Sequence, residues 1–138
     1  MGCWGTGTFD NEYARDWVRV LEERDGLGAV SQVLCAPRNG EFIKADEAVA
    51  SLAAAEVVAA LLGHPSGELP IGVARWISEH RGLDARPYRE IALNHARAIL
   101  AGNSELRKRW AADEAGFPFW KATVEALIAR LESTGHGA

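Results

Sequence analysis

The residue best placed to do chemistry in this sequence is Glu56, which stands almost alone in a long apolar segment. Its neighbours from residue 46 to residue 62 are mostly Ala, Val and Leu. An ionised carboxylate in a dry interior is costly unless it is paired or hydrogen-bonded, and otherwise its pKa rises. Three environments are open to it: a structural position that accepts hydrogen bonds from indole or backbone N–H groups, a carboxylate poised in a cleft, or exposure on a groove.

Polar and aromatic side chains near the N-terminus form a second group that we expect to meet Glu56. Residues 2–9 are glycine-rich, and Trp4 and Phe9 are expected to anchor this stretch in the core. The indoles and the amides of this stretch are hydrogen-bond donors without obvious partners. We therefore expect residues 4–11 to pack near Glu56. The resulting candidate cluster, functional or structural, is Trp4, Asp10, Asn11, Asp16, Trp17 and Glu56.

The sequence indicates no metal, cofactor or nucleophile site. Cys3 and Cys35 are too few for a metal or redox motif, and Cys35 is expected to be a small buried hydrophobe. The early glycines do not follow a strand, as a dinucleotide loop requires, and there is no nucleophile elbow. His80 and His95 are expected on the inner faces of successive helices, but no histidines pair at metal-binding spacing. The four histidines are His64, His80, His95 and His136.

The segment that carries Glu56 is predicted to be a central helix over about residues 46–62. Alanine has the highest helix propensity, and Asp46 is a favourable N-cap. Gly63 suits the left-handed position after the helix, and Pro65 prevents its continuation. A helix that is apolar on nearly every face must be enclosed by other helices.

Five or six further helices are expected around it, which predicts an all-α bundle of six or seven short helices in a single domain, residues 1–138. Asp10 is predicted to cap the first one, with Tyr13, Trp17, Val20 and Leu21 on its apolar face. One or two of the five tryptophans are expected near the surface, and no sheet is expected. The expected ranges are 11–24, 27–35, 70–81, 87–101, 104–115 and 118–133.

Composition limits the function classes. The 138 residues are 48% hydrophobic and 25% charged, as in ordinary soluble globular domains. The formal net charge of −4 lacks the basic footprint of a nucleic-acid-binding protein. No spanning segment or signal peptide is indicated, and two cysteines in a helical chain are expected to stay reduced in the cytoplasm.

Several stretches resemble one bacterial family of helical proteins, domain-of-unknown-function family 4259. The resemblance covers nearly the whole chain, and its opening motif is the more specific part. It implies a bacterial, cytosolic setting with no established activity, so no catalytic residue can be carried over. The matching residues are Gly2-Cys3-Trp4-Gly5-Thr6-Gly7-Thr8-Phe9-Asp10-Asn11, Ala14, Asp16-Trp17, Ala45-Asp46-Glu47-Ala48, Ala53 to Leu61, Leu69-Pro70 and Ser104-Glu105-Leu106.

Three functions remain open. The acidic first helix and the surplus of aromatic residues favour a protein-interaction module of the immunity or adaptor type, whose partner is another protein. The alternative is a small-ligand-binding or enzymatic domain that uses a cleft carboxylate, Glu56. A housekeeping fold with self-association is the third. The sequence assigns no reaction.

Overall fold

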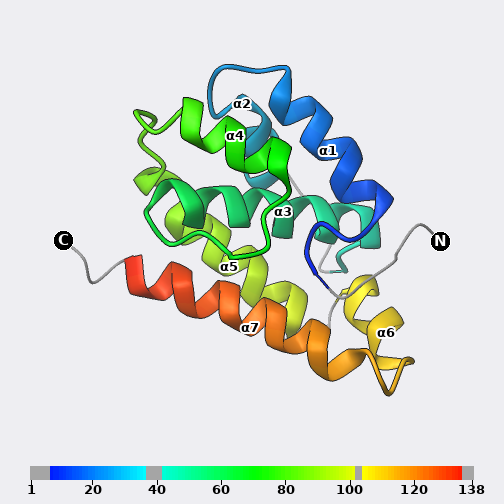
Figure 1. The fold of residues 1–138 in the computed structure, drawn as a ribbon. Helices are drawn as coiled ribbons and strands as arrows, with labels where there is room; N and C mark the ends of the chain where they lie inside the picture. Colours follow the sequence, from blue (N-terminus) through cyan, green and yellow to red (C-terminus); the bar gives the residue numbers. More distant parts are fainter. Residues whose placement is uncertain (1–6, 37–41, 102–103, 135–138) are drawn as a thin grey trace.

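The computed structural model describes residues 7–36, 42–101 and 104–134, and within them the chain is all-α (Figure 1). No strand occurs in the described part, where an isolated parallel bridge joins Ile43 to Ser104. The predicted all-α bundle is therefore confirmed. Its elements are α1 Glu12–Glu22, α2 Gly28–Leu34, α3 Ala45–Leu61, α4 Ile71–Glu79, a 3-10 turn Arg86–Tyr88, α5 Arg89–Leu100, α6 Glu105–Ala111 and α7 Phe117–Thr134.

Helix α3 is the centre of the molecule, as its composition predicts. It contacts each of the other six α-helices, and 13 of its 17 residues are buried. Figure 1 shows α1, α2 and α4 on one side of it and α5 and α7 on the other. Its many alanines have short side chains, which lets so many neighbours approach one helix closely.

The two ends of α3 are stabilised in different ways. Asp46 is not the N-cap that the sequence predicts, because the helix begins one residue earlier and Lys44 holds the cap position without a side-chain bond. Instead, the Ala45 N–H donates to Glu105 Oε1 of α6 at 2.7 Å. At the other end, Gly63 has the predicted left-handed backbone, with φ of 97°, and ends the helix.

Helix α1 lies in a different orientation from the predicted one. Its N-cap is Asn11, not Asp10, because the Asn11 side chain accepts from the Ala14 N–H at 2.8 Å. The buried face consists of Ala14, Trp17, Val18 and Leu21. Tyr13 and Val20, which the sequence places inward, are 45% and 36% exposed.

Two features outside the core differ from, or extend, the sequence predictions. Cys35 is exposed, because it follows α2 where the chain leaves the core. Among the described tryptophans, Trp110 alone is not buried, which fits the expectation of one or two near the surface.

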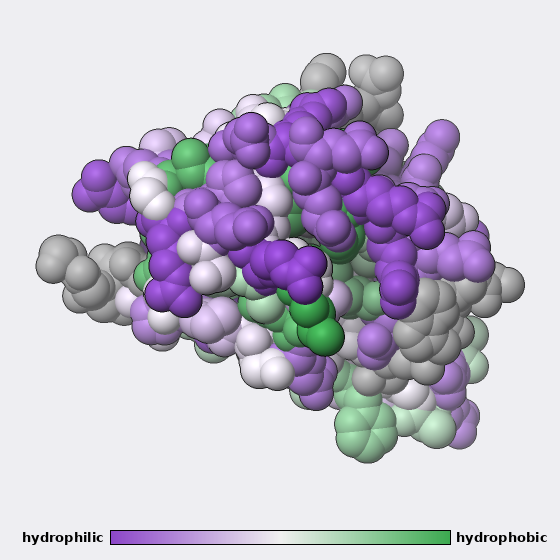
Figure 2. Space-filling view, turned by 45° about the horizontal axis from the view of Figure 1, so that its top comes forward, coloured by the Kyte–Doolittle hydropathy of each residue, from purple (hydrophilic) through white to green (hydrophobic). Residues whose placement is uncertain are grey.

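The surface over α1, α2 and α4 is mostly hydrophilic (Figure 2). No described helix has both the length and the apolar character that crossing a membrane requires.

Candidate functional site

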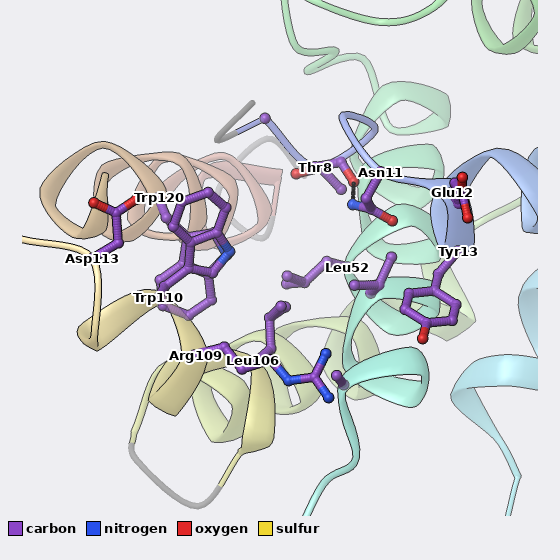
Figure 3. A pocket seen from close by; sticks show the side chains of 13 residues that line it. Thr8, Asn11, Glu12, Tyr13, Leu52, Leu106, Arg109, Trp110, Asp113 and Trp120 are labelled. Atoms are coloured by element: carbon purple, nitrogen blue, oxygen red, sulfur yellow. Dashed lines mark hydrogen bonds between the residues drawn. The ribbon is translucent and has the colours of Figure 1, made fainter. Parts of the chain in front are cut away.

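An open, largely apolar groove of about 440 Å³ runs between the start of α1, α3, α6 and the start of α7. Val49, Leu52 and Leu106 form its floor, which we call the leucine floor. Figure 3 shows Glu12 and Tyr13 at one end of this floor and Trp110, Trp120 and Asp113 at the other. Its volume lies within the range of ligand sites in proteins, about 300–1,000 Å³. We call it the α1–α6 groove.

The loop before α1 fixes the first end of the groove. Asp10 Oδ2 accepts from the Gly7 N–H at 3.0 Å, and Asn11 Nδ2 donates to the Thr8 carbonyl at 3.3 Å. Asn11 also caps α1. Two of the predicted cluster residues, Asp10 and Asn11, therefore hold the loop and the helix start that present Glu12 and Tyr13 to the groove.

The turn between α6 and α7 fixes the second end. Asp113 Oδ1 accepts from the backbone N–H groups of Ala115 and Gly116 at 3.2 and 3.0 Å. A Cβ placed on Gly116 would lie 2.6 Å from Asp113 Oδ2 and 2.8 Å from Trp110 Cζ3. Both groups thus border the same small space, so the carboxylate and the indole lie next to each other. Any larger residue at position 116 would push them apart.

The charges around the groove are uneven. Among the lining residues, Glu12 and Asp113 are acidic and Arg109 is basic. Arg109 Nη2 is already paired with Glu105 Oε2 at 3.0 Å, across one helical turn. The hydrogen bond from the Ala45 N–H, followed by the nearby Arg109 charge, lowers the pKa of Glu105. No described residue forms an ion pair with Glu12 or Asp113, so the groove carries an excess of negative charge.

Glu56 lies deeper, on the same face of α3 but outside the groove lining. It is 2% exposed. Arg130 Nη2 of α7 lies 2.7 Å from Glu56 Oε1 as an ion pair, and the same nitrogen donates a hydrogen bond to Oε2 at 3.2 Å. Desolvation raises the pKa of Glu56 above its usual value, although the Arg130 charge and hydrogen bonds from Arg130 and the Thr8 side chain oppose the rise.

The main partner of Glu56 is not among the predicted donors. Thr8, in the expected opening segment, does interact with the carboxylate. The indoles do not, because Trp17 Nε1 donates to the Ala29 carbonyl at 3.4 Å. The main partner is Arg130, 74 positions away in the sequence. Glu56 lines neither the α1–α6 groove nor the two other hollows, beside α2 and α4, that the described residues form.

The remaining predicted cluster residues lie apart from Glu56. Asp16 is exposed and pairs with Arg19 at 3.4 Å on the outer face of α1. Trp17 packs in the core between α1 and α2. Trp4 lies outside the described residues. The described cluster residues therefore divide into two that hold the loop beside the groove, one on the surface of α1, one core tryptophan and one buried carboxylate.

His80 and His95 take structural positions. His95 Nε2 lies 3.0 Å from the Leu34 carbonyl, which can only accept, so this nitrogen carries the proton. His95 Nδ1 then accepts from the Ser51 hydroxyl at 3.1 Å. His80 instead stacks on Trp76, with ring centroids 4.2 Å apart. The described residues contain no group of three metal-ligating side chains.

Sequence reasoning missed four residues that matter here: Tyr13, Trp110, Asp113 and Arg130. Trp110 and Asp113 are three positions apart, and Gly116 follows by another three, a spacing that indicates a compact turn. That signal was available from the sequence. The sequence offers none for Arg130, whose partner depends on how α7 packs against α3.

Comparison with known proteins gives one family and no relative of established activity. Neither the curated proteins nor the solved structures contain a match to this chain. One family model matches residues 2–123, which is most of the chain, and it confirms the family that the opening residues resemble. The chain belongs to the family described as "Domain of unknown function (DUF4259)".

Proposed function

We propose that this protein is a protein-interaction module that docks a segment of a partner protein in the α1–α6 groove. The observation that carries the proposal is the groove itself, an open apolar channel with aromatic residues at both ends of its leucine floor. Aromatic side chains dominate the binding energy of protein interfaces. Small-molecule sites enclose most of their ligand, whereas this groove is open to solvent and suits a segment that enters and leaves.

An adaptor or immunity role in the bacterial cytoplasm is the finer part of this proposal. Such proteins act by covering a surface of another protein, for which a docking groove is sufficient. The buried pairing of Glu56 with Arg130 favours docking over the alternative of a cleft carboxylate, because Glu56 is not presented to a ligand. A toxin gene beside the gene for this chain would support the immunity role in particular.

Selection of random peptides against the full chain tests the docking site. Peptides enriched on the wild-type protein should bind Tyr13→Ala and Trp110→Ala more than about tenfold more weakly, since each variant removes an aromatic contact. Val20→Ala on α1 and Phe119→Ala on α7 are the controls, because both side chains are exposed and neither lines the groove. Equal binding to all four variants would place the interaction elsewhere and refute the proposal.

A second copy of the chain is the competing occupant. Sedimentation velocity of the wild type and of Tyr13→Ala separates the two cases. A dimer that dissociates in the variant would assign the groove to self-association. A wild-type monomer would leave the groove free for a partner.

A further inference from the structure

The α1–α6 groove holds a specific arrangement of charge that narrows the class of partner. At one end, Glu12 neighbours Tyr13 on α1, and at the other, Asp113 neighbours Trp110. Each end thus holds a carboxylate and an aromatic ring, and the leucine floor lies between the two ends. A carboxylate beside an aromatic face attracts a cation through both its charge and the ring quadrupole.

The carboxylates are available to a ligand. Asp113 uses Oδ1 for the backbone of the α6–α7 turn, and no described residue donates to Oδ2. Glu12 is exposed and likewise forms no hydrogen bond or ion pair with the described part of the chain. Both groups can therefore accept hydrogen bonds without breaking existing ones.

The one basic residue in the lining does not cancel this charge. Arg109 is bound to Glu105 at 3.0 Å, so its charge is compensated within α6. The Trp110 and Trp120 indoles line the groove, and each carries an N–H donor. A peptide backbone that lies along the groove offers carbonyl oxygens for such donors.

We infer that the groove recognises an extended peptide segment in which an apolar residue is flanked by two basic residues, Lys or Arg. The apolar residue covers the leucine floor, one cation meets Glu12 and Tyr13, and the other meets Asp113 and Trp110. This inference rests on the proposed function above. It specifies which residues of the docked segment are basic and that they stand on both sides of the apolar residue. An acidic or neutral apolar segment lacks the groups that the two ends select.

The peptide selection also tests this inference when it is repeated on the Glu12→Gln/Asp113→Asn double variant. Both substitutions keep size and shape, and the amide introduced at position 113 retains a carbonyl oxygen for the backbone of the turn. Peptides selected on the wild type should carry Lys or Arg on both sides of an apolar residue. Those selected on the variant should lose the basic residues and keep the apolar one.

A direct measurement uses the strongest wild-type peptide and its analogue with each Lys or Arg replaced by norleucine. Asp113→Asn alone should weaken the basic peptide about two- to fivefold and leave the analogue unchanged, as expected for an exposed ion pair. Added salt should weaken only the basic peptide. Glu125→Gln, an exposed carboxylate of α7 that does not line the groove, is the control and should change neither affinity.

The outcomes separate the two proposals. Groove-dependent peptides without basic residues, or an analogue that binds as tightly as its parent, would refute the basic partner and leave the docking groove intact. Peptides that ignore Tyr13→Ala and Trp110→Ala, or a selection that enriches none, would refute both. Groove-dependent basic peptides that respond to Asp113→Asn would support both.

Discussion

The Arg130 guanidinium lies 2.7 Å from the buried carboxylate of Glu56 and joins the last helix to the central one. Only 3% of the Glu56 side chain is exposed, against 22% for Arg130. The negative charge of the buried Glu56 is thus compensated by Arg130, which is partly exposed. The pair links α3 to α7, and Arg130 also donates to the His64 carbonyl at 3.2 Å, beyond the end of α3.

Removal of Arg130 should destabilise the fold strongly. Arg130→Ala leaves a buried carboxylate unpaired, and we expect the free energy of unfolding to fall by about 2–4 kcal/mol in urea titrations. Arg97→Ala is the control, because the Arg97–Glu132 pair is half-exposed on both sides and should contribute at most about 1 kcal/mol. Glu56→Leu combined with Arg130→Met should be more stable than Arg130→Ala. Equal losses for Arg97→Ala and Arg130→Ala would contradict the buried pair.

The raised pKa of Glu56 predicts a distinct pH dependence. A carboxyl group with a higher pKa in the folded chain binds more protons there than in the unfolded chain. Its contribution to the free energy of unfolding therefore falls as pH rises from the unfolded pKa, about 4.3, through the folded pKa. Glu56→Gln removes this effect, so stability of the variant minus that of the wild type should increase with pH. Chemical denaturation of both proteins across this pH range measures the difference. If the difference decreased with pH, the pKa of Glu56 would be lowered in the folded chain.

Gly63 should be intolerant of a side chain. With φ of 97°, it adopts a backbone conformation that costs L-residues about 1–2 kcal/mol. Gly63→Ala should lower the free energy of unfolding by about that amount in thermal or urea melts. Gly67→Ala, in the same loop, meets no atom within 4 Å and has no positive φ, so it should be close to neutral. Similar losses at both positions would show that the left-handed backbone of Gly63 is not the cause of the loss.

The Ser51–His95 hydrogen bond should contribute to the packing of α3 against α5. Ser51→Ala removes the hydroxyl that donates to His95 Nδ1 and leaves that nitrogen without this buried partner. We expect a loss of about 1–2 kcal/mol in unfolding free energy. Ser78→Ala on the exposed side of α4 is the matched control and should change stability by less than about 0.5 kcal/mol. If Ser51→Ala left the free energy of unfolding unchanged, the Ser51–His95 hydrogen bond would contribute nothing to stability.

The fold could be predicted from sequence because its central feature is local. An alanine-rich segment with one acidic residue specifies a helix, its burial and the need of Glu56 for a partner, all within 18 residues of sequence. The identity of that partner could not be predicted, because it depends on the rotation of α7 against α3. The prediction of the α3 N-cap was also wrong because of a residue distant in sequence. Glu105 of α6 accepts from the first turn of α3 in place of a local cap.

The groove was missed because of one local error and one distant relationship. The predicted α1 face placed Tyr13 and Val20 inward, but the helix is rotated so that Ala14 and Val18 are buried instead. Tyr13 therefore turns outward into the groove lining. The other end depends on where the α6–α7 turn lies relative to α1, and no sequence pattern relates them.

The hydrogen bond from the Ala45 N–H to Glu105 also bears on the order in which the molecule is completed. The two residues are 60 positions apart, and a ribosome adds about 5–20 residues per second. The carboxylate that closes the first turn of the central helix is therefore synthesised about 3–12 s after the turn itself. During that interval the nascent helix has a frayed beginning, and its N-terminal boundary is settled only when the sixth helix arrives.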